Sequence, residues 1–367
     1  MTTLRVVIDG ILDPTSRGVA RYTEELARAL ILVAPRGTEV EGIVSASTEP
    51  EYADLHDRLP GLTRLYKTAL SRRELVRAWQ HGFTTSPGGG MIHAPSLLAP
   101  LRRHDRLNAA GEQVVVTIHD LIPWTAPDTL DGRPASWYRS MAKRAQKYAD
   151  GVVVPTHALA DELAEHVDFG DRVRVIPPAI SPNVREPADA DERAARLGLP
   201  QRYLLTLASL NPRKGLAELL EAIRGLDIAL LVVGEPGWRD ASVPESDSIV
   251  SLGVLDDSDY LTVLARALAF VEPALISGPG APILEAMHLG TPVIAADLPQ
   301  SVELAADGAL FVPRSPEGYV DALRAAIESL LSDDRARERL TILGQDRARS
   351  FTWAGAADKV WQLHADL

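Results

Sequence analysis

The chain has 367 residues, more than one hydrophobic core usually supports, so two domains are expected. Its net charge of −12 argues against nucleic-acid binding that depends on phosphate neutralisation, and the absence of cysteine excludes disulfides and thiolate metal sites. The chain opens without a basic leader, and no apolar run reaches the roughly 18 to 20 residues of a membrane-spanning helix. A cytoplasmic protein is therefore expected.

Residues 1–180 alternate between short apolar runs and amphipathic segments. A β-rich run ends at Gly10, and residues 18–35 then show helical spacing that ends at Pro35. Further strands are predicted in EVEGIVSA, MIHAP, QVVVTIHD, GVVVPT and RVRVIPP, with helices in SWYRSMAKRAQKYA and HALADELAEHV. This alternation predicts a mostly parallel, doubly wound sheet.

Residues 64–77 hold five cations, which face only Glu74 in a stretch predicted to be helical. A solvated helix face is the favoured interpretation, and contact with an anionic lipid surface is the alternative.

The alternation pauses in IPPAISPNVREPADADERAARLGLP, where prolines and acids crowd together as in a linker, and then restarts. Strands are predicted in RYLLTLASL, IALLVVG, SIVSLGV, LAFVEPA, TPVIAAD and ALFVP, with helices between them. A second Rossmann-like domain is therefore predicted over residues 181–348. Residues 349–367 form an amphipathic tail, predicted to be a helix that packs on the first domain through Trp353, Val360, Trp361 and Leu363.

Ligands of open α/β sheets bind beyond the carboxyl ends of the strands, and two such domains that face each other form a cleft. The first candidate segment is DGILDPTSRGVARYTEEL, in which Gly18 allows close backbone approach where a helix begins. Amides at a helix N-terminus suit a phosphate. A simple turn without a ligand is the alternative.

The second candidate segment, TLASLNPRKGLAELLEAI, places Arg213 and Lys214 between a strand and a helix. Only five of the 38 cationic residues are lysines, so a lysine at a helix start is less readily accidental. Two cations can hold a pyrophosphate and neutralise it as it departs. A solvated turn is equally compatible with this segment alone.

The third segment, ALISGPGAPILEAMHLGTPVI, predicts a short helix that begins near Pro282 and ends at Gly290. Glu285, near the beginning of this helix, could accept hydrogen bonds from a ribose diol, and Gly278 and Gly280 could expose their amides to a sugar or a phosphate. As an alternative, Glu285 only complements the helix dipole.

Histidines follow two of the predicted strands in the first domain. His119 and Asp120 end one strand, and His93 has the same placement in MIHAPS. An imidazole there can donate to a sugar hydroxyl or take part in proton transfer, although a lone histidine is more often structural.

Together these segments resemble the retaining glycosyltransferases of family 4, which have the GT-B fold, and in particular bacterial mannosyltransferase-like members used in surface-polysaccharide and glycolipid assembly. The resemblance runs through nearly the whole chain and rests on RGVARYTEELARAL, MIHAPS, VVVTIHDLIP, NPRKGLAELLEAI, VVGEPGW, GAPILEAMHLGTPVIAAD and the final FTW-containing helix. It implies that the C-terminal domain holds a nucleotide diphosphate sugar, that the N-terminal domain supplies the acceptor side, and that no metal or further cofactor is required.

The resemblance also implies a role for each matching residue. These roles are the diphosphate clamp for Arg213 and Lys214, the ribose ligand for Glu285, a backbone contact to phosphate for Gly18, contact with the transferred sugar for His119, and the surroundings of the base for residues 252–254, including Val254. The placement of the other candidates adds donor-side contacts for Ser277, Gly278 and Gly280 and acceptor-side positions for His93 and Asp120.

Three positions depart from the family pattern. Ser277 stands where the family usually has the first of two glutamates, an acid that contacts hydroxyls of the donor sugar. Ser209 stands where an arginine is common, and Glu272 stands where an apolar residue is usual. These departures bear on the identity of the donor and on catalytic strength.

The resulting hypothesis is a metal-independent retaining transferase that moves a hexose from a nucleotide diphosphate sugar, with GDP-mannose as the working donor, to a saccharide or lipid-linked acceptor. Peripheral contact with the inner membrane face through residues 64–77 is an additional hypothesis. The alternatives are a noncatalytic nucleotide-sugar-binding protein of the same fold and a sugar-nucleotide epimerase. A NAD-dependent oxidoreductase is disfavoured because the glycine fingerprint is missing.

Overall fold

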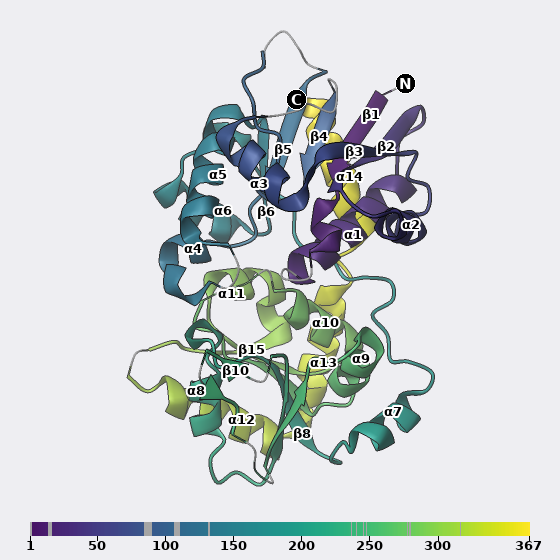
Figure 1. Ribbon diagram of the computed structural model, residues 1–367. Helices are drawn as coiled ribbons and strands as arrows, with labels where there is room; N and C mark the ends of the chain where they lie inside the picture. Colours follow the sequence, from purple (N-terminus) through teal and green to yellow (C-terminus); the bar gives the residue numbers. More distant parts are fainter. Residues whose placement is uncertain are drawn as a thin grey trace. The chain divides into compact units, whose positions relative to one another are not determined.

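The chain divides into two compact units in a computed structural model (Figure 1). Unit 1 comprises Met1–Pro178 and Thr352–Leu367, and unit 2 comprises Ala179–Phe351. The structure describes residues 2–13, 17–83, 90–105, 111–130, 133–235, 237–239, 241–244, 246, 248–276, 278, 280–315 and 317–367.

Unit 1 contains a seven-stranded parallel sheet in the order β3-β2-β1-β4-β5-β6-β7. Its strands are β1 (Thr2–Val7), β2 (Thr38–Ala46), β3 (Arg64–Ser71), β4 (Met91–Ala94), β5 (Gln113–Thr117), β6 (Gly151–Val154) and β7 (Val173–Val175). Its helices are η1 (Asp9–Leu12), α1 (Arg17–Leu32), α2 (Glu49–Arg58), α3 (Arg72–His81), α4 (Ile122–Thr125), η2 (Pro127–Thr129), α5 (Ala135–Tyr148), α6 (His157–His166), η3 (Gly170–Arg172) and α14 (Trp353–Asp366).

Unit 2 contains a six-stranded parallel sheet in the order β12-β9-β8-β13-β14-β15. Its strands are β8 (Tyr203–Leu207), β9 (Ala229–Val233), β12 (Ile249–Gly253), β13 (Ala269–Glu272), β14 (Val293–Ala296) and β15 (Ala309–Val312), beside the short hairpin of β10 (Gly237–Trp238) and β11 (Ala241–Ser242). Its helices are α7 (Ala190–Leu197), η4 (Pro212–Lys214), α8 (Leu216–Ala222), α9 (Asp257–Ala265), α10 (Ala281–Leu289), α11 (Pro299–Ala305), η5 (Ala306–Gly308), α12 (Tyr319–Ser332) and α13 (Asp334–Ala348).

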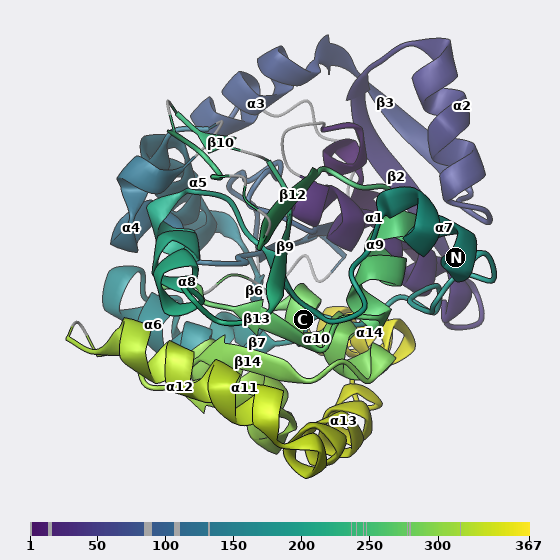
Figure 2. The same ribbon diagram turned by 90° about the horizontal axis from the view of Figure 1, so that it is seen from below.

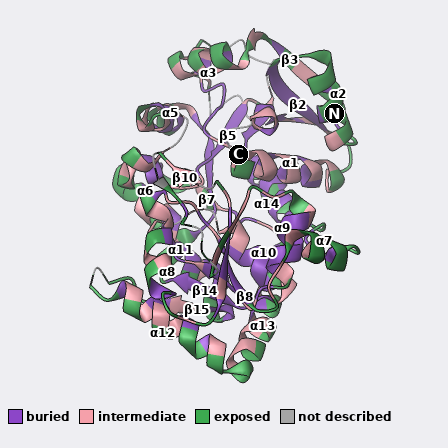
Figure 3. Ribbon diagram, turned by 60° about the horizontal axis from the view of Figure 1, so that its bottom comes forward, coloured by how far each residue is buried: buried purple, intermediate pink, exposed green. Residues whose placement is uncertain are grey.

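Both faces of the unit 2 sheet are covered, which explains why its strands read as continuous apolar runs. Helices α8 and α12 lie beside each other on the face that includes Val271, and α9 and α10 cover the face that includes Phe270 (Figure 2). Both residues are fully buried. The inner strands β8, β9, β13 and β14 are accordingly mostly buried, whereas the edge strand β12 is more exposed and the outer faces of the helices are exposed (Figure 3). Within the described part of the chain, no helix is long and apolar enough to cross a membrane.

Most strands and helices predicted from the sequence are present, but the basic segment 64–77 is not one helix. Residues 64–71 form β3, the edge strand that pairs with β2, and α3 begins only at Arg72. Ser71 and Glu74 form a capping box at the start of α3. The Ser71 amide donates to the Glu74 carboxylate over 2.9 Å, and the Ser71 hydroxyl also donates to it over 2.6 Å. Pairing with β2 therefore overrides the helical pattern of residues 64–71. The S-x-x-E spacing of Ser71 and Glu74 could have indicated where the helix begins.

The final helix belongs to unit 1, where it covers the sheet face opposite α3, α5 and α6. Trp361 Nε1 donates to the Leu30 carbonyl over 3.2 Å, and the buried Val360 lies on the same helix. A buried histidine pair adds to this contact. His364 Nδ1 lies 2.9 Å from Gln113 Oε1, and His364 Nε2 lies 3.4 Å from His93 Nδ1.

This histidine pair is expected to make stability depend on pH. Burial lowers the pKa of His364 to about 3 and lowers the pKa of His93 well below its ordinary value. Since both rings accept protons more readily after unfolding, the free energy of unfolding should fall as pH drops from the unfolded pKa near 6.5. For His364 alone, the loss between about pH 7 and about pH 5 should be about 2 kcal/mol.

Urea unfolding of the wild type and of His364→Gln at both pH values measures this effect. The variant should be less stable near neutral pH but should lose less stability on acidification, whereas His56→Gln, which changes an exposed ring, should keep the wild-type slope. An unchanged slope in His364→Gln would contradict the assignment of this proton linkage to the buried pair.

Candidate functional site

Both sheets change strand order at one point, and candidate residues gather there. In unit 1 the chain leaves β1 and β4 in opposite directions, and in unit 2 it does the same at β8 and β13. Because all strands of each sheet are parallel, their carboxyl ends share an edge, and loops that diverge at a switch point leave a crevice for a ligand. Each unit therefore offers one site at its own switch point.

The unit 2 site begins with a tight turn after β8. Asn211 is buried, and its side chain accepts a hydrogen bond from the Arg213 amide over 3.3 Å. The Lys214 amide donates to the Asn211 carbonyl over 2.8 Å, which closes the short helix η4. Arg213 and Lys214 therefore lie in η4, before α8 rather than in it. Helix α8 has only seven residues, so its N-terminus is not counted as an anion site. The positive charge of this turn therefore comes from the side chains of Arg213 and Lys214.

Backbone hydrogen bonds fix this turn to the loop after β13. The Arg213 carbonyl accepts from the Leu275 amide over 2.9 Å and from the Ile276 amide over 3.3 Å. Gly215, with φ of +66°, allows the close approach, because a Cβ there would lie 1.9 Å from the Pro273 carbonyl oxygen. The two segments at the switch point are therefore held against each other by main-chain contacts.

The two cations of this turn lack carboxylate partners. Neither Arg213 nor Lys214 makes an ion pair with any carboxylate of the described residues, and both side chains are half-buried. Arg213 Nε is buried, and no hydrogen-bond acceptor among the described residues reaches it. A buried donor without a partner is costly, so this turn is suited to an anionic ligand that supplies oxygen acceptors.

Glu272, the last residue of β13, lies within the electrostatic reach of both cations. Burial raises the pKa of its carboxyl, and Lys214 and Arg213 oppose that rise. It makes no ion pair with either of them. Ser277, which stands where the family has an acid, lies outside the described residues.

Helix α10 carries Glu285 beside the same sheet edge. Its bounds agree with the prediction, because Pro282 lies in its first turn and Gly290, with φ of +81°, caps its end. Glu285 is the fifth residue of this helix and is buried, and its carboxylate accepts from the Tyr260 hydroxyl over 3.1 Å. Because no acid lies in the first turn of α10, the helix-dipole explanation for Glu285 is wrong.

The other predicted donor contacts also lie past the carboxyl ends of unit 2 strands. Gly280 has φ of +74°, and a Cβ there would lie 2.3 Å from Leu304 Cδ1, whereas a Cβ on Gly278 would meet nothing. Val254 directly follows β12, with 44% of its surface exposed. All three roles remain predictions.

The unit 1 site is a cavity of about 110 Å³ at the β1/β4 switch point. His119 and Asp120, which follow β5, line it, in agreement with their predicted strand-end placement. The His119 Nε2 atom lies 2.8 Å from the Pro95 carbonyl and therefore donates to it, which leaves Nδ1 as the acceptor of the neutral ring. Burial lowers the pKa of His119, which favours this neutral form.

Gly18 and His93 lie elsewhere in unit 1. Gly18 is exposed in the first turn of α1, with open space around its Cα, so its contact with a phosphate remains a prediction. His93 has no exposed surface and packs against His364. Because the His93 ring is fully buried, it cannot contact an acceptor substrate. His93 therefore has a packing role, and the acceptor-side position predicted for it from the sequence is not supported.

Several residues of the two sites were not identified from the sequence. In unit 1 they line the cavity and are Asp13 after η1, Arg72 of α3, Trp124 of α4, Arg133 before α5, and Trp137 and Tyr138 of α5. In unit 2 the residue is Tyr260. Only the cap at Ser71 gave a signal, since it places Arg72 at a helix start. Among the described residues, no group of His, Asp and Glu side chains could hold a metal.

Comparisons with known proteins agree with this architecture. Residues 16–184 match the family described as Glycosyltransferase Family 4, and residues 189–347 match the family described as Glycosyl transferases group 1. The O-antigen chain mannosyltransferase B of Escherichia coli is 28% identical, with 92% of each chain covered. The D-inositol 3-phosphate glycosyltransferase of Corynebacterium diphtheriae is 28% identical over 59% of this chain and 56% of its own.

A solved structure of Anabaena HepE in complex with UDP and glucose superposes with a TM-score of 0.71 at 16% identity, covering 100% of both chains. This likeness confirms the predicted GT-B architecture of two Rossmann-like domains.

Gly215→Ala tests the close approach that positions the cationic turn. The added methyl group would need the left-handed conformation and would collide with the Pro273 carbonyl. Gly225→Ala is a matched control, because Gly225 has φ of +76° but open space around it. Gly225→Ala should cost about 1 kcal/mol of unfolding free energy, and Gly215→Ala at least about 2 kcal/mol more. Equal losses in urea unfolding would contradict the tight packing of this turn.

Proposed function

We propose that this chain, which belongs to the Family 4 glycosyltransferases, transfers a hexose from a nucleoside diphosphate sugar to an acceptor hydroxyl with retention of configuration. The observation that carries the proposal is the pair of adjacent cations, Arg213 and Lys214, which lack a carboxylate partner among the described residues and lie at the unit 2 switch point. A diphosphate supplies the charge and the acceptor oxygens that these side chains require.

The donor binds to unit 2 in this proposal. Arg213 and Lys214 hold the diphosphate, and Glu285 accepts hydrogen bonds from the ribose hydroxyls. Tyr260 positions Glu285, because its hydroxyl donates to that carboxylate. The base lies near Val254, whose exposed side chain offers an apolar contact. This arrangement uses side chains of η4, α9 and α10.

Transfer proceeds through an oxocarbenium-like sugar in this proposal. The acceptor oxygen forms a bond to the anomeric carbon as the bond from that carbon to the phosphate oxygen breaks, and the leaving phosphate oxygen takes the acceptor's proton on the same face. Negative charge grows on the diphosphate during this step, so Arg213 and Lys214 stabilise the transition state more than the ground state. His119 contacts the transferred sugar through Nδ1, because Nε2 is bonded to Pro95.

The proposed donor is GDP-mannose, and the acceptor is a saccharide or a lipid-linked saccharide. The name of the Escherichia coli relative supports mannose, whereas HepE is a relative in fold whose structure holds UDP and glucose.

Peripheral membrane contact would rest on Arg64, Arg73 and Arg77, which are exposed and make no ion pair among the described residues. Arg72 is excluded from that surface because it pairs with Asp13. Co-sedimentation with vesicles of anionic lipid tests this contact.

Nucleotide binding tests the donor site without an acceptor. A ligand that binds only the folded protein stabilises it by about 2.7 kcal/mol at one hundred times its Kd. GDP and GDP-mannose should therefore raise the melting temperature more than UDP, ADP or TDP and their sugars. Glu285→Gln should reduce the shift, because the amide is a weaker acceptor for the ribose hydroxyls. If no nucleotide shifts the melting temperature of the wild type, the assignment of the donor site to unit 2 is wrong.

Lys214→Ala tests the proposed charge stabilisation. Removing one such cation should lower kcat about a hundredfold, equivalent to about 2.7 kcal/mol, because the leaving diphosphate loses a charged hydrogen bond. Lys359→Ala is the control, since Lys359 is exposed on α14. Product formation from GDP-mannose, followed by mass spectrometry, measures both variants. Unchanged turnover in Lys214→Ala would remove the proposed role, and binding without transfer to any acceptor would favour the noncatalytic alternative.

A further inference from the structure

The unit 1 cavity combines aromatic rings with charged groups, in a pattern that indicates which acceptors it can take. Trp124, Trp137 and Tyr138 supply the rings, and Asp13 and Arg133 are among the polar side chains that line it. The assignment of this cavity to the acceptor side of the reaction rests on the proposed function.

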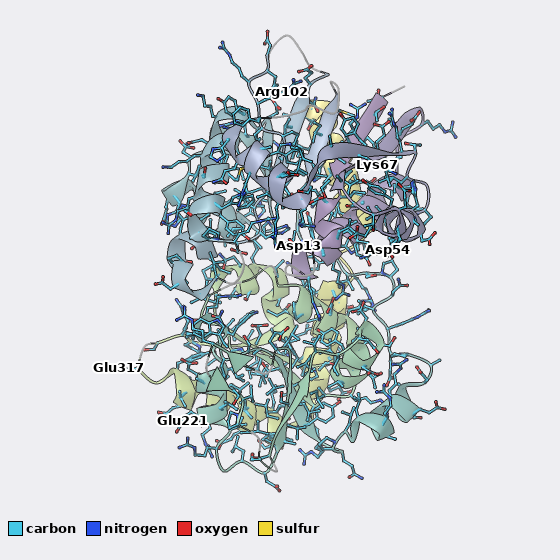
Figure 4. All side chains as sticks on the ribbon, viewed as in Figure 1. Asp13, Asp54, Lys67, Arg102, Glu221 and Glu317 are labelled. Carbon is cyan, nitrogen blue, oxygen red and sulfur yellow. The ribbon has the colours of Figure 1, made fainter. Side chains whose placement is uncertain are left out.

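The arginines of this cavity are already offset by carboxylates. Arg72 Nη2 lies 2.8 Å from Asp13 Oδ2, and Arg72 Nη1 lies 3.5 Å from the fully buried Asp9 carboxylate and donates to the Asp9 carbonyl over 2.7 Å. The Arg133 Nη2 atom lies 3.9 Å from the same Asp13 oxygen. Asp13 therefore contacts both guanidinium groups, and its side chain is only 11% exposed. Asp13 is labelled in Figure 4.

The guanidinium of Arg133 also lies over the Trp137 ring, 4.6 Å from its centroid. Burial lowers the pKa of Arg133, and Asp13 and Asp9 oppose that effect. Its charge thus depends on the nearby acids and on the ring face. Asp120 adds another carboxylate to the lining.

This charge balance disfavours an anionic ligand. The described cavity holds two arginines, Arg72 and Arg133, against Asp13 and Asp120, with Asp9 behind Arg72. A phosphate or carboxylate would have to displace Asp13 from both guanidinium groups or lie beside it, and like charges in a partly buried site repel strongly. Hydroxyl groups instead can donate to the carboxylates and accept from the guanidinium groups without breaking these pairs.

We propose that the unit 1 cavity is the acceptor subsite for an uncharged sugar residue, and that Asp13 is the specificity-determining residue that excludes phosphorylated acceptors. The sugar hydroxyls bond to Asp13 and Arg133, and the aromatic side chains cover its apolar faces. The acceptor class is thus a neutral saccharide rather than a phosphate-bearing one of the kind named for the Corynebacterium relative.

Asp13→Asn tests this assignment, because it keeps the side chain's shape and removes the charge between the two arginines. Binding is measured in an Arg213→Ala/Lys214→Ala background, so that anions do not bind at the unit 2 turn. The probes are methyl α-mannoside and mannose 6-phosphate, followed by NMR titration. Without the Asp13 substitution, the protein should prefer the neutral probe. Asp13→Asn should raise the affinity for mannose 6-phosphate relative to methyl α-mannoside at least about tenfold.

Two further variants keep the test decisive. Asp54→Asn is the matched control, because Asp54 also pairs with an arginine, Arg58, but on the surface of α2 (Figure 4). It should leave the preference unchanged. The double change Asp13→Asn with Arg133→Gln removes one charge of each sign, and it should restore the preference for the neutral probe. If Asp13→Asn alone fails to fold, the preference of the protein that retains Asp13 still tests the proposal.

Some outcomes would overturn the proposal. One is a preference for mannose 6-phosphate in the protein that retains Asp13. The other is an Asp13→Asn variant whose preference between the two probes does not change, as in the Asp54→Asn control. Failure of the proposed function itself gives a different result, namely the absence of any nucleotide-induced stabilisation in the wild type, and the sugar titration does not depend on that experiment.

Discussion

Two adjacent cations at the unit 2 switch point, Arg213 and Lys214, lack carboxylate partners among the described residues, and the proposed function depends on them. Like charges this close repel, and a buried guanidinium donor without an acceptor is costly. The turn holds its shape through main-chain hydrogen bonds to the loop after β13 and through the Asn211 side chain, so it does not use the charged groups of Arg213 and Lys214 for stability. Those side chains are therefore available for a ligand that carries negative charge.

At the unit 1 switch point, by contrast, the arginines are paired with carboxylates. Arg72 and Arg133 both contact Asp13, so the cavity is close to neutral before any ligand binds. The same topology thus produces two kinds of site, because Arg72 and Arg133 form ion pairs with carboxylates, whereas Glu272 lies near Arg213 and Lys214 without pairing with either. Uncompensated arginine and lysine suit a diphosphate, and compensated arginines suit hydroxyl groups. The charge balance at each sheet edge, more than the fold, distinguishes the donor from the acceptor in this account.

The sequence predicted most of the fold, because parallel strands buried on both faces read as continuous apolar runs between amphipathic helices. It failed where tertiary contacts decide the structure. Residues 64–71 carry a helical pattern, yet pairing with β2 makes them a strand. His93 was placed correctly at a strand, but burial against the final helix, more than 250 residues later, removes it from solvent. Asp13 could not be recognised, because its role comes from two arginines far along the chain, Arg72 at the start of α3 and Arg133 before α5.

The most direct test of the central claim is a crystal structure of the protein with a nucleoside diphosphate bound. We expect the phosphate oxygens to lie within hydrogen-bond distance of Arg213 Nε and Lys214 Nζ, and the ribose hydroxyls to donate to Glu285. A diphosphate bound elsewhere, with the η4 turn empty or its cations paired to the protein's own carboxylates, would contradict it.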